Sequence, residues 1–182
     1  MSAQFPEYFA LFGIAPRFAI DPEQLTRAYR EVLSQVHPDR FAGAGPAERR
    51  AAMQLASHAN EAFEVLRSDV RRASYLCGRQ GLVVDGPGAV PLPPEFLERQ
   101  MQWHEDLDAA RAARDASRID RLRGEVAWQR AGRLEQVAQA IDEKSDYPAA
   151  AAAVRALMFL DKLGGDIDRA ATLCSDALGT EK

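Results

Sequence analysis

The sequence predicts an all-α fold in which a small helical hairpin domain precedes a helical bundle. Outside one central segment, apolar residues recur at the three- and four-residue spacing of amphipathic helices. That segment, residues 81–94, holds three glycines and four prolines, which excludes a helix and divides the chain near its middle. No alternating strand pattern of useful length occurs, apart from the weak run Leu82-Val83-Val84.

Two helical stripes joined by a loop dominate the first half. A helix is expected to begin at Asp21-Pro22, because aspartate caps helix N termini and proline suits the first helical position. It ends at His37-Pro38, since proline disfavours helical geometry in the residue before it. After a loop rich in Gly and Ala, a second helix is expected over residues 47–66. A short apolar segment, residues 8–14, is expected to lie across this pair, and residues 70–76 form one further short helix.

The second half contains three long helical patterns. They run over residues 94–114, 117–143 and 148–163. Because glycine is a poor helix former, a break is expected at Gly164-Gly165, after which Asp166 caps a final helix ending at Leu178. These patterns predict a bundle of helices around one apolar core.

Charge and hydropathy exclude several classes of partner. The 182 residues include 23 Lys and Arg against 27 Asp and Glu, a net charge of −4. Nucleic-acid-binding proteins normally carry a basic excess, so we expect no nucleic-acid partner. We find no run of 18 apolar residues and no secretory signal at the start, MSAQFPEYFALFG, so we expect a cytoplasmic protein with no membrane partner.

The sequence gives no sign of a catalytic or metal site. It contains no Gly-rich phosphate loop, no G-x-S-x-G and no H-E-x-x-H. His37 and Asp39 are separated by a proline, a spacing that gives no evident hydrogen-bonded acid–base pair. The three histidines are dispersed, and Cys77 and Cys174 form no C-x-x-C pair. We therefore expect a protein that is not an enzyme and holds no cofactor or metal.

The tripeptide His37-Pro38-Asp39 stands at the corner between the two N-terminal helical stripes. Taken alone it is compatible with an ordinary turn in which the aspartate side chain hydrogen-bonds the nearby backbone. Its placement favours a different interpretation, because a proline-stiffened corner holds an imidazole and a carboxylate in fixed, exposed positions. Little conformational entropy is then lost when a partner binds.

The helix expected from Pro94 carries more apolar residues than one narrow core face can hold. At about 100° per residue, four of them fall in one sector and are assigned to the core: Phe96, Trp103, Leu107 and Ala110. Leu97 and Met101 lie roughly 100–140° around the helix, in a sector shared with His104 and Asp108 and edged by Glu105. They belong either to an unusually wide core face or to a surface on which the apolar pair is buried by a partner and the acids orient it.

The string YFALFGIAPRFAIDPEQLTRAYREVLSQVHPDRF resembles the start of a J-domain, the module that stimulates ATP hydrolysis by DnaK-type chaperones. Residues 60–66 and 72–76 resemble its later helices. The resemblance implies that His37, Pro38 and Asp39 are required for stimulation, with Asp39 pairing with a chaperone arginine. It also implies that Arg27 and Arg30, with Arg40 just beyond the motif, dock on an acidic chaperone surface. Glu23 and Glu31 offset part of this positive charge.

The resemblance extends over nearly the whole chain to HscB-type proteins, J-type co-chaperones of bacterial iron–sulfur cluster assembly. It rests on FALFGI, on Phe96-Leu97 with Gln100-Met101, and on RALMFLDKL at residues 155–163. It implies a J-domain at 1–80, a linker at 81–94 and a bundle at 95–182. The J-domain would recruit an HscA-type chaperone, and the bundle would bind an IscU-type scaffold protein. The implied scaffold contacts are Leu97, Met101, Gln102, Glu105 and Phe159.

The sequence departs from the HscB pattern at two positions, and it leaves two alternative functions open. Glu98 stands where relatives commonly have an apolar residue, and Gln102 where they commonly have an acid. A J-domain adaptor for a general DnaK-type chaperone with another client would have the same first half. A helical adaptor with no chaperone link would make the residue 37–39 tripeptide an ordinary turn.

Overall fold

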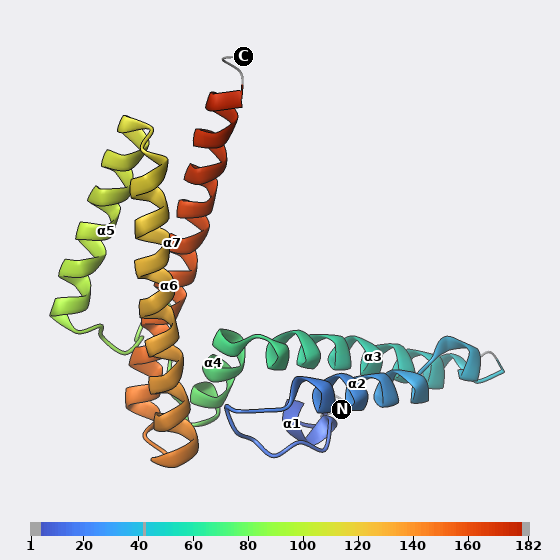
Figure 1. The fold of residues 1–182 in the computed structure, drawn as a ribbon. Coiled ribbons are helices and arrows are strands. Elements are labelled where there is room, and N and C mark those ends of the chain that lie inside the picture. Colours follow the sequence, from blue (N-terminus) through green and yellow to red (C-terminus); the bar gives the residue numbers. More distant parts are fainter. Residues whose placement is uncertain (1–4, 42, 180–182) are drawn as a thin grey trace. The chain divides into compact units, whose positions relative to one another are not determined.

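Helices form both halves of the chain, as the sequence predicts (Figure 1). The computed structural model describes residues 5–41 and 43–179, and no strand forms within them. Two compact units are present, Met1–Arg79 and Gln80–Lys182. The Gly- and Pro-rich run that opens the second unit is irregular, and its weak strand pattern forms no ladder. It makes a tight loop instead, with the Val90 N–H donating to the Val83 carbonyl at 3.2 Å.

The first unit is built on an antiparallel hairpin of α2 (Pro22–Gln35) and α3 (Pro46–Arg67) (Figure 1). Asp21 caps α2 as predicted, since its carboxylate accepts a backbone N–H of the first turn at 2.9 Å. After α2 the chain passes His37 and enters a short 3-10 turn, η1 (Pro38–Phe41), within the segment predicted as loop. The tip of the hairpin therefore contains a short helical turn that the sequence analysis does not predict.

An aromatic pair holds the two helices of the hairpin together. The ring of Tyr29 on α2 stacks on Phe63 of α3, with the centroids 4.2 Å apart. Its hydroxyl donates to Asn60 Oδ1 at 2.9 Å. Ala52 and Ala59 are buried, so small side chains allow close approach of the helices, as predicted. These contacts fix the direction in which the hairpin presents its tip.

Two short helices complete the first unit. α1 (Tyr8–Leu11) packs against α3 and buries Phe9, as expected for the N-terminal apolar segment. α4 (Asp69–Arg79) is longer than the predicted residues 70–76. The ring of Tyr8 stacks on Tyr75 of α4 at 4.5 Å between centroids. α1 and α4 are thereby joined to each other, and both pack against α3 of the hairpin.

Arg72 is the one buried charged side chain among the described residues, 6% exposed. Its guanidinium donates to the carbonyls of Phe18 at 2.8 Å and Leu66 at 2.6 Å and to Asp69 Oδ1 at 2.6 Å. It also lies over the Phe18 ring, 4.9 Å from the centroid. One planar group thus connects the loop before α2 with the junction of α3 and α4.

Arg72→Lys is expected to destabilise the first unit by about 2–3 kcal/mol, because an ammonium cannot reach three acceptors in the fork geometry of a guanidinium. Urea denaturation of the full chain, followed by far-UV circular dichroism, measures the loss. Arg71→Lys, at the exposed neighbouring position, is the control and should change stability by less than about 0.5 kcal/mol. Equal losses in the two variants would contradict a structural role for the fork.

The second unit is a three-helix bundle of α5 (Pro94–Ala113), α6 (Ala116–Ala138) and α7 (Tyr147–Gly179). The predicted helix over 117–143 does not stay regular to its end. Its last turn is the π-helical segment η2 (Gln139–Glu143), which leads into α7. The predicted core sector of α5 is buried as expected. The core comprises Phe96, Trp103, Leu107, Ala110, Ile119, Leu122, Val126, Ala156, Leu160, Leu163, Ile167, Ala170 and Cys174.

The predicted break at Gly164-Gly165 is wrong, because α7 runs through both glycines without interruption. Each glycine in a helix costs about 1 kcal/mol relative to alanine. Leu163 and Ile167 on either side are fully buried, and their burial outweighs that cost. Asp166 does not cap a new helix: its carbonyl accepts from Arg111 of α5 at 3.0 Å.

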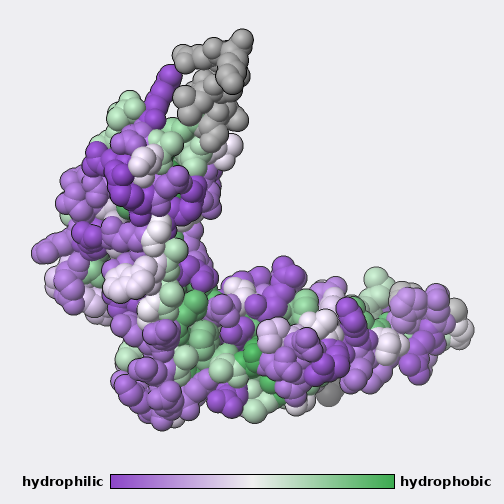
Figure 2. Space-filling view, in the orientation of Figure 1, coloured by the Kyte–Doolittle hydropathy of each residue, from purple (hydrophilic) through white to green (hydrophobic). Residues whose placement is uncertain are grey.

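Most of the surface visible in Figure 2 is hydrophilic, with smaller apolar patches over both units. Among the described residues, no helix is both long enough and apolar enough to cross a bilayer.

Candidate functional site

The hairpin tip exposes an imidazole and a carboxylate. The side chains of His37 and Asp39 are 60% and 91% exposed. Nδ1 of His37 accepts the backbone N–H of Asp39 at 3.3 Å and lies 3.5 Å from Asp39 Oδ2. The sequence spacing predicts no close approach of this imidazole and carboxylate, whereas the structure brings the two side chains within 3.5 Å of each other. Because Nδ1 acts as an acceptor, the neutral ring carries its proton on Nε2, and no acceptor within the described chain meets that atom.

The backbone around the tip is held by short-range bonds. The Arg40 N–H donates to the His37 carbonyl at 3.0 Å, and the Arg40 guanidinium donates to the Ser34 carbonyl at 3.4 Å. The backbone of Pro38 opens η1, while its side chain lies outside the described part of the chain. This arrangement suits an exposed docking corner. Both functional groups face water.

The basic residues of α2 differ in how much of their charge is available. Arg27 lies 3.7 Å from Asp21 Oδ2 and 3.5 Å from Glu23 Oε2, so two carboxylates of its own chain offset its charge. Arg30 is exposed and forms no ion pair within the described residues. Glu31, expected to offset this charge as well, pairs with neither arginine in that part of the chain. Arg30 is therefore the more available cation of the two.

Leu97 and Met101 form an exposed apolar pair on α5. Leu97 is 46% exposed and Met101 is 65% exposed, so the wide-core alternative is wrong for these two side chains. Glu105, His104 and Asp108 are exposed on the same side of the helix. We call these five residues the α5 face.

Phe159 of α7 lies at the margin of the α5 face and is half-buried. Its ring stacks on Trp103 at 6.2 Å and meets Phe96 edge-on at 5.7 Å. It also meets the His104 ring edge-on at 5.6 Å, which connects it to the α5 face. Gln102 is exposed but lies about 100° around α5 from Met101, so it does not share that face.

The orientation of α5 is fixed by polar contacts with α6. Trp103 Nε1 donates to Glu125 Oε1 at 2.8 Å, and Arg99 forms an ion pair with the same carboxylate. Asp106 accepts from Arg118 at 2.8 Å. The sequence analysis missed the contribution of Glu125 and the ring contact of His104. No local pattern could have found them, because each depends on a side chain from another helix.

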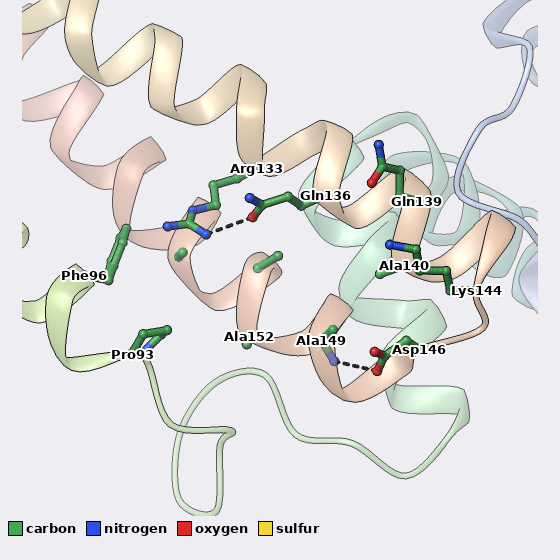
Figure 3. Close-up of a pocket in the computed structure, with 12 residues that line it drawn as sticks. Pro93, Phe96, Arg133, Gln136, Gln139, Ala140, Lys144, Asp146, Ala149 and Ala152 are labelled. Atoms are coloured by element: carbon green, nitrogen blue, oxygen red, sulfur yellow. Dashed lines mark hydrogen bonds between the residues drawn. The ribbon is translucent and has the colours of Figure 1, made fainter.

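A separate hollow of about 320 Å³ opens where α5 begins and η2 leads into α7 (Figure 3). Four alanines of α7 line it, together with the basic residues Arg133 and Lys144. Arg133 donates to Gln136 at 2.8 Å and lies over the Phe96 ring, 5.4 Å from the centroid. None of the residues predicted for the tip or for scaffold binding lines this hollow.

The cysteines show no feature of a metal site. Cys77 and Cys174 are both buried, each in a different unit. Burial raises the pKa of Cys77 to about 11, so its thiol stays protonated at neutral pH and is a poor metal ligand. Within the described residues, no three His, Cys, Asp or Glu side chains converge on one point.

An antiparallel helical hairpin with His-Pro-Asp at its tip, followed by a three-helix bundle, defines a J-domain protein with a C-terminal helical domain. The family model described as the HSCB C-terminal oligomerisation domain matches residues 92–168. The co-chaperone protein HscB homolog of Bordetella pertussis is 43% identical over 164 residues, covering 90% of this chain and 95% of that protein. The corresponding protein of Cupriavidus taiwanensis is also 43% identical, covering 90% and 93%.

Solved structures agree with this assignment. Chaperone HscB from Vibrio cholerae superposes with a TM-score of 0.80 at 30% identity, covering 93% of this chain and 99% of its own. Human co-chaperone HscB gives a TM-score of 0.81 at 20% identity, covering 90% and 81%, and supports the fold alone. The chain belongs to the HscB family of co-chaperones.

Proposed function

We propose that this protein stimulates the ATPase of an HscA-type chaperone and delivers an IscU-type scaffold protein to it for iron–sulfur cluster maturation. The observation that carries the proposal is the separation of two exposed surfaces on two folded units. The His37-Asp39 tip belongs to the first unit, and the α5 face with Phe159 belongs to the second. Membership of the HscB family supports the pairing of these two activities.

At the tip, the proposed contact with the chaperone is a charge-assisted one. The carboxylate of Asp39 is almost fully exposed and makes only one weak contact of its own, so it can accept both donors of an arginine fork. His37 offers an Nε2–H donor beside it. Since the ring already accepts the Asp39 N–H, its orientation is set before docking, and less entropy is lost on binding.

Arg30 and Arg40 supply the proposed attraction to an acidic chaperone surface, with a smaller contribution from Arg27. Exposed charges of this kind act mainly on the rate of encounter and are weakened by salt. The internal ion pairs of Arg27 make this helix a weaker electrostatic partner than its count of arginines indicates.

Glu23→Gln is expected to free Arg27 from one of its two carboxylates. The concentration of this protein needed for half-maximal ATPase stimulation should then fall about two- to threefold at low ionic strength, and the difference should disappear at high salt. Steady-state ATPase titrations at two salt concentrations measure it. Glu95→Gln makes the same charge change in the first turn of α5 and should have no effect. An equal effect of both variants would attribute the change to net charge alone.

For the scaffold, the proposed surface is the α5 face with Phe159. Leu97 and Met101 provide apolar area that a partner can bury, and Glu105 and Asp108 provide acidic groups that orient it. Because α5 is fixed to α6 through Glu125, this surface is organised before the scaffold binds. Docking of both partners on one chain raises the effective concentration of the scaffold at the chaperone.

The test is steady-state ATP hydrolysis by a purified HscA-type chaperone, with full-length protein and an IscU-type scaffold added separately and together. We expect stimulation by this protein alone and a further increase when the scaffold is present. No stimulation in either case would overturn the proposal. Equal stimulation with and without the scaffold would overturn its delivery half and favour a different client.

A further inference from the structure

The hollow where α5 begins is the open end of a groove between α6 and α7. Over most of its length α5 lies against both of these helices, and its first large side chain, Phe96, belongs to the core of the bundle. Before Pro94 there is no helix to fill the groove, and the facing sides of α6, η2 and α7 enclose the hollow of about 320 Å³ (Figure 3). The hollow therefore continues the groove that α5 occupies.

The two long walls of the hollow differ in chemistry. Ala149, Ala152 and Ala156 recur at three- and four-residue intervals, so they lie on one side of α7. Their methyl groups allow close approach of another helix, because the distance between packed helices depends on the side chains at the contact. Arg133 and Lys144 lie on the facing wall, eleven positions or about three turns apart, with Arg133 nearer to α5 (Figure 3). One wall is thus apolar, and the other carries two separated cations.

Neither cation is neutralised by a carboxylate within the described residues. The Arg133 guanidinium donates to the Gln136 side chain at 2.8 Å and lies over the Phe96 ring, 5.4 Å from its centroid. Both of these partners are uncharged, so they orient the guanidinium and leave its positive charge unmatched. Lys144 is exposed and makes no ion pair in that part of the chain.

One carboxylate, that of Asp146, also lines the hollow. It accepts the Ala149 N–H at 3.1 Å, and the Asp146 carbonyl accepts the Ala150 N–H at 3.0 Å, so this residue caps the start of α7. Two positive side chains and one negative side chain leave the hollow with a positive charge, although the whole chain has a net charge of −4. The hollow is therefore complementary to an acidic occupant.

We propose that this hollow binds an acidic amphipathic helix of a partner protein. The apolar face of that helix packs on the alanines of α7, and two of its carboxylates pair with Arg133 and Lys144. A helix is the occupant that fits, because α5 fills the adjoining part of the same groove as a helix, and amphipathic helices commonly bind in apolar grooves. If it runs along α6, its two carboxylates stand about eleven residues apart.

The contact covers about three turns of helix, which is at the small end of protein interfaces. We therefore expect a dissociation constant on the order of 100 µM for an isolated helix. The inference does not depend on the chaperone or scaffold assignments, because neither the hairpin tip nor the α5 face lines this hollow.

Fluorescence anisotropy of a labelled synthetic peptide, titrated with the full-length protein up to about 1 mM, tests the proposal. The probe is an Ala- and Leu-rich helix of about twenty residues with two glutamates about eleven positions apart on the edge of its apolar face. In the control peptide both glutamates are replaced by lysine. The control should bind about tenfold more weakly or not at all, because it opposes like charges. No binding of the glutamate peptide, or equal binding of both peptides, would overturn the proposal.

The double variant Arg133→Gln/Lys144→Gln removes both cations and should weaken binding of the glutamate peptide about tenfold or more. Arg121→Gln/Lys162→Gln is the matched control. It makes the same charge change at exposed positions of α6 and α7 that do not line the hollow, and it should bind as the wild type does. Equal losses in the two double variants would attribute binding to net charge and overturn the assignment to the hollow.

The double variant Ala149→Leu/Ala152→Leu fills the hollow with side chains. Leucine is nearly as good a helix former as alanine, and Ala149 is exposed and Ala152 half-buried, so the variant should fold with the wild-type far-UV circular dichroism spectrum. Binding of the glutamate peptide should be lost, and retained binding would contradict the proposal. Sedimentation equilibrium of the protein without peptide tests the other occupant, since a dimer that this variant dissociates would assign the hollow to a second copy and overturn the proposal.

Discussion

His37→Gln is expected to reduce stimulation of the chaperone ATPase to near the basal rate, a loss of about tenfold or more. Such a loss corresponds to more than about 1.4 kcal/mol of coupling between the tip and the chaperone. Glutamine keeps an amide donor but cannot reproduce the ring that accepts the Asp39 N–H and directs Nε2–H outward. The measurement is steady-state ATP hydrolysis at saturating concentrations of this protein.

His58→Gln is the matched control for this prediction. His58 lies on α3, where its Nε2 is 2.8 Å from the Pro6 carbonyl, and a glutamine amide can still donate there. Stimulation should be retained in this variant, and far-UV circular dichroism should show that both variants fold. Asp39→Asn, which removes the exposed negative charge, should resemble His37→Gln. Full stimulation by His37→Gln would refute the role of the tip.

The triple variant Leu97→Ala/Met101→Ala/Phe159→Ala is expected to weaken scaffold binding by about 2–5 kcal/mol, the range found for central apolar residues of interfaces. Leu97 and Met101 are exposed, so their truncation should cost little stability. Phe159 packs on Trp103 and Phe96, so its truncation should also destabilise the second unit. Isothermal titration of an IscU-type scaffold measures the affinity.

Stability and binding are separated by comparing the triple variant with the double variant Leu97→Ala/Met101→Ala. The double variant should keep the wild-type unfolding midpoint and still lose most of the affinity. Leu173→Ala, at a 70% exposed apolar position of α7, should affect neither property. If the triple variant binds the scaffold with wild-type affinity while folded, the α5 face is not the binding surface.

Local sequence rules predicted most of the helices because each start or stop has a local cause. Asp21 caps α2, and a proline ends it within two residues of the predicted point. Periodicity correctly assigned Phe96, Trp103, Leu107 and Ala110 to the core, because a helix in a bundle buries the face that carries its large apolar groups.

The errors occur where contacts between helices outweigh local preference. The two adjacent glycines, Gly164 and Gly165, predict a break in the helix from local preference alone. α7 is nevertheless continuous, because Leu163 and Ile167 on either side are buried in the core. The predicted helix over 117–143 ends in the π turn η2, which no sequence period indicates. The status of Phe159 was equally inaccessible, since four adjacent apolar residues give no phase to the helix.

The sequence by itself determined the helical class, the position of the His-Pro-Asp corner and the family resemblance, because these depend on residue type and spacing along the chain. Only the tertiary structure decided that Leu97 and Met101 are exposed and that Phe159 adjoins them through His104. It also left Trp128 of α6 exposed. Exposure is the area left after every other helix has packed, so no single helical pattern contains it.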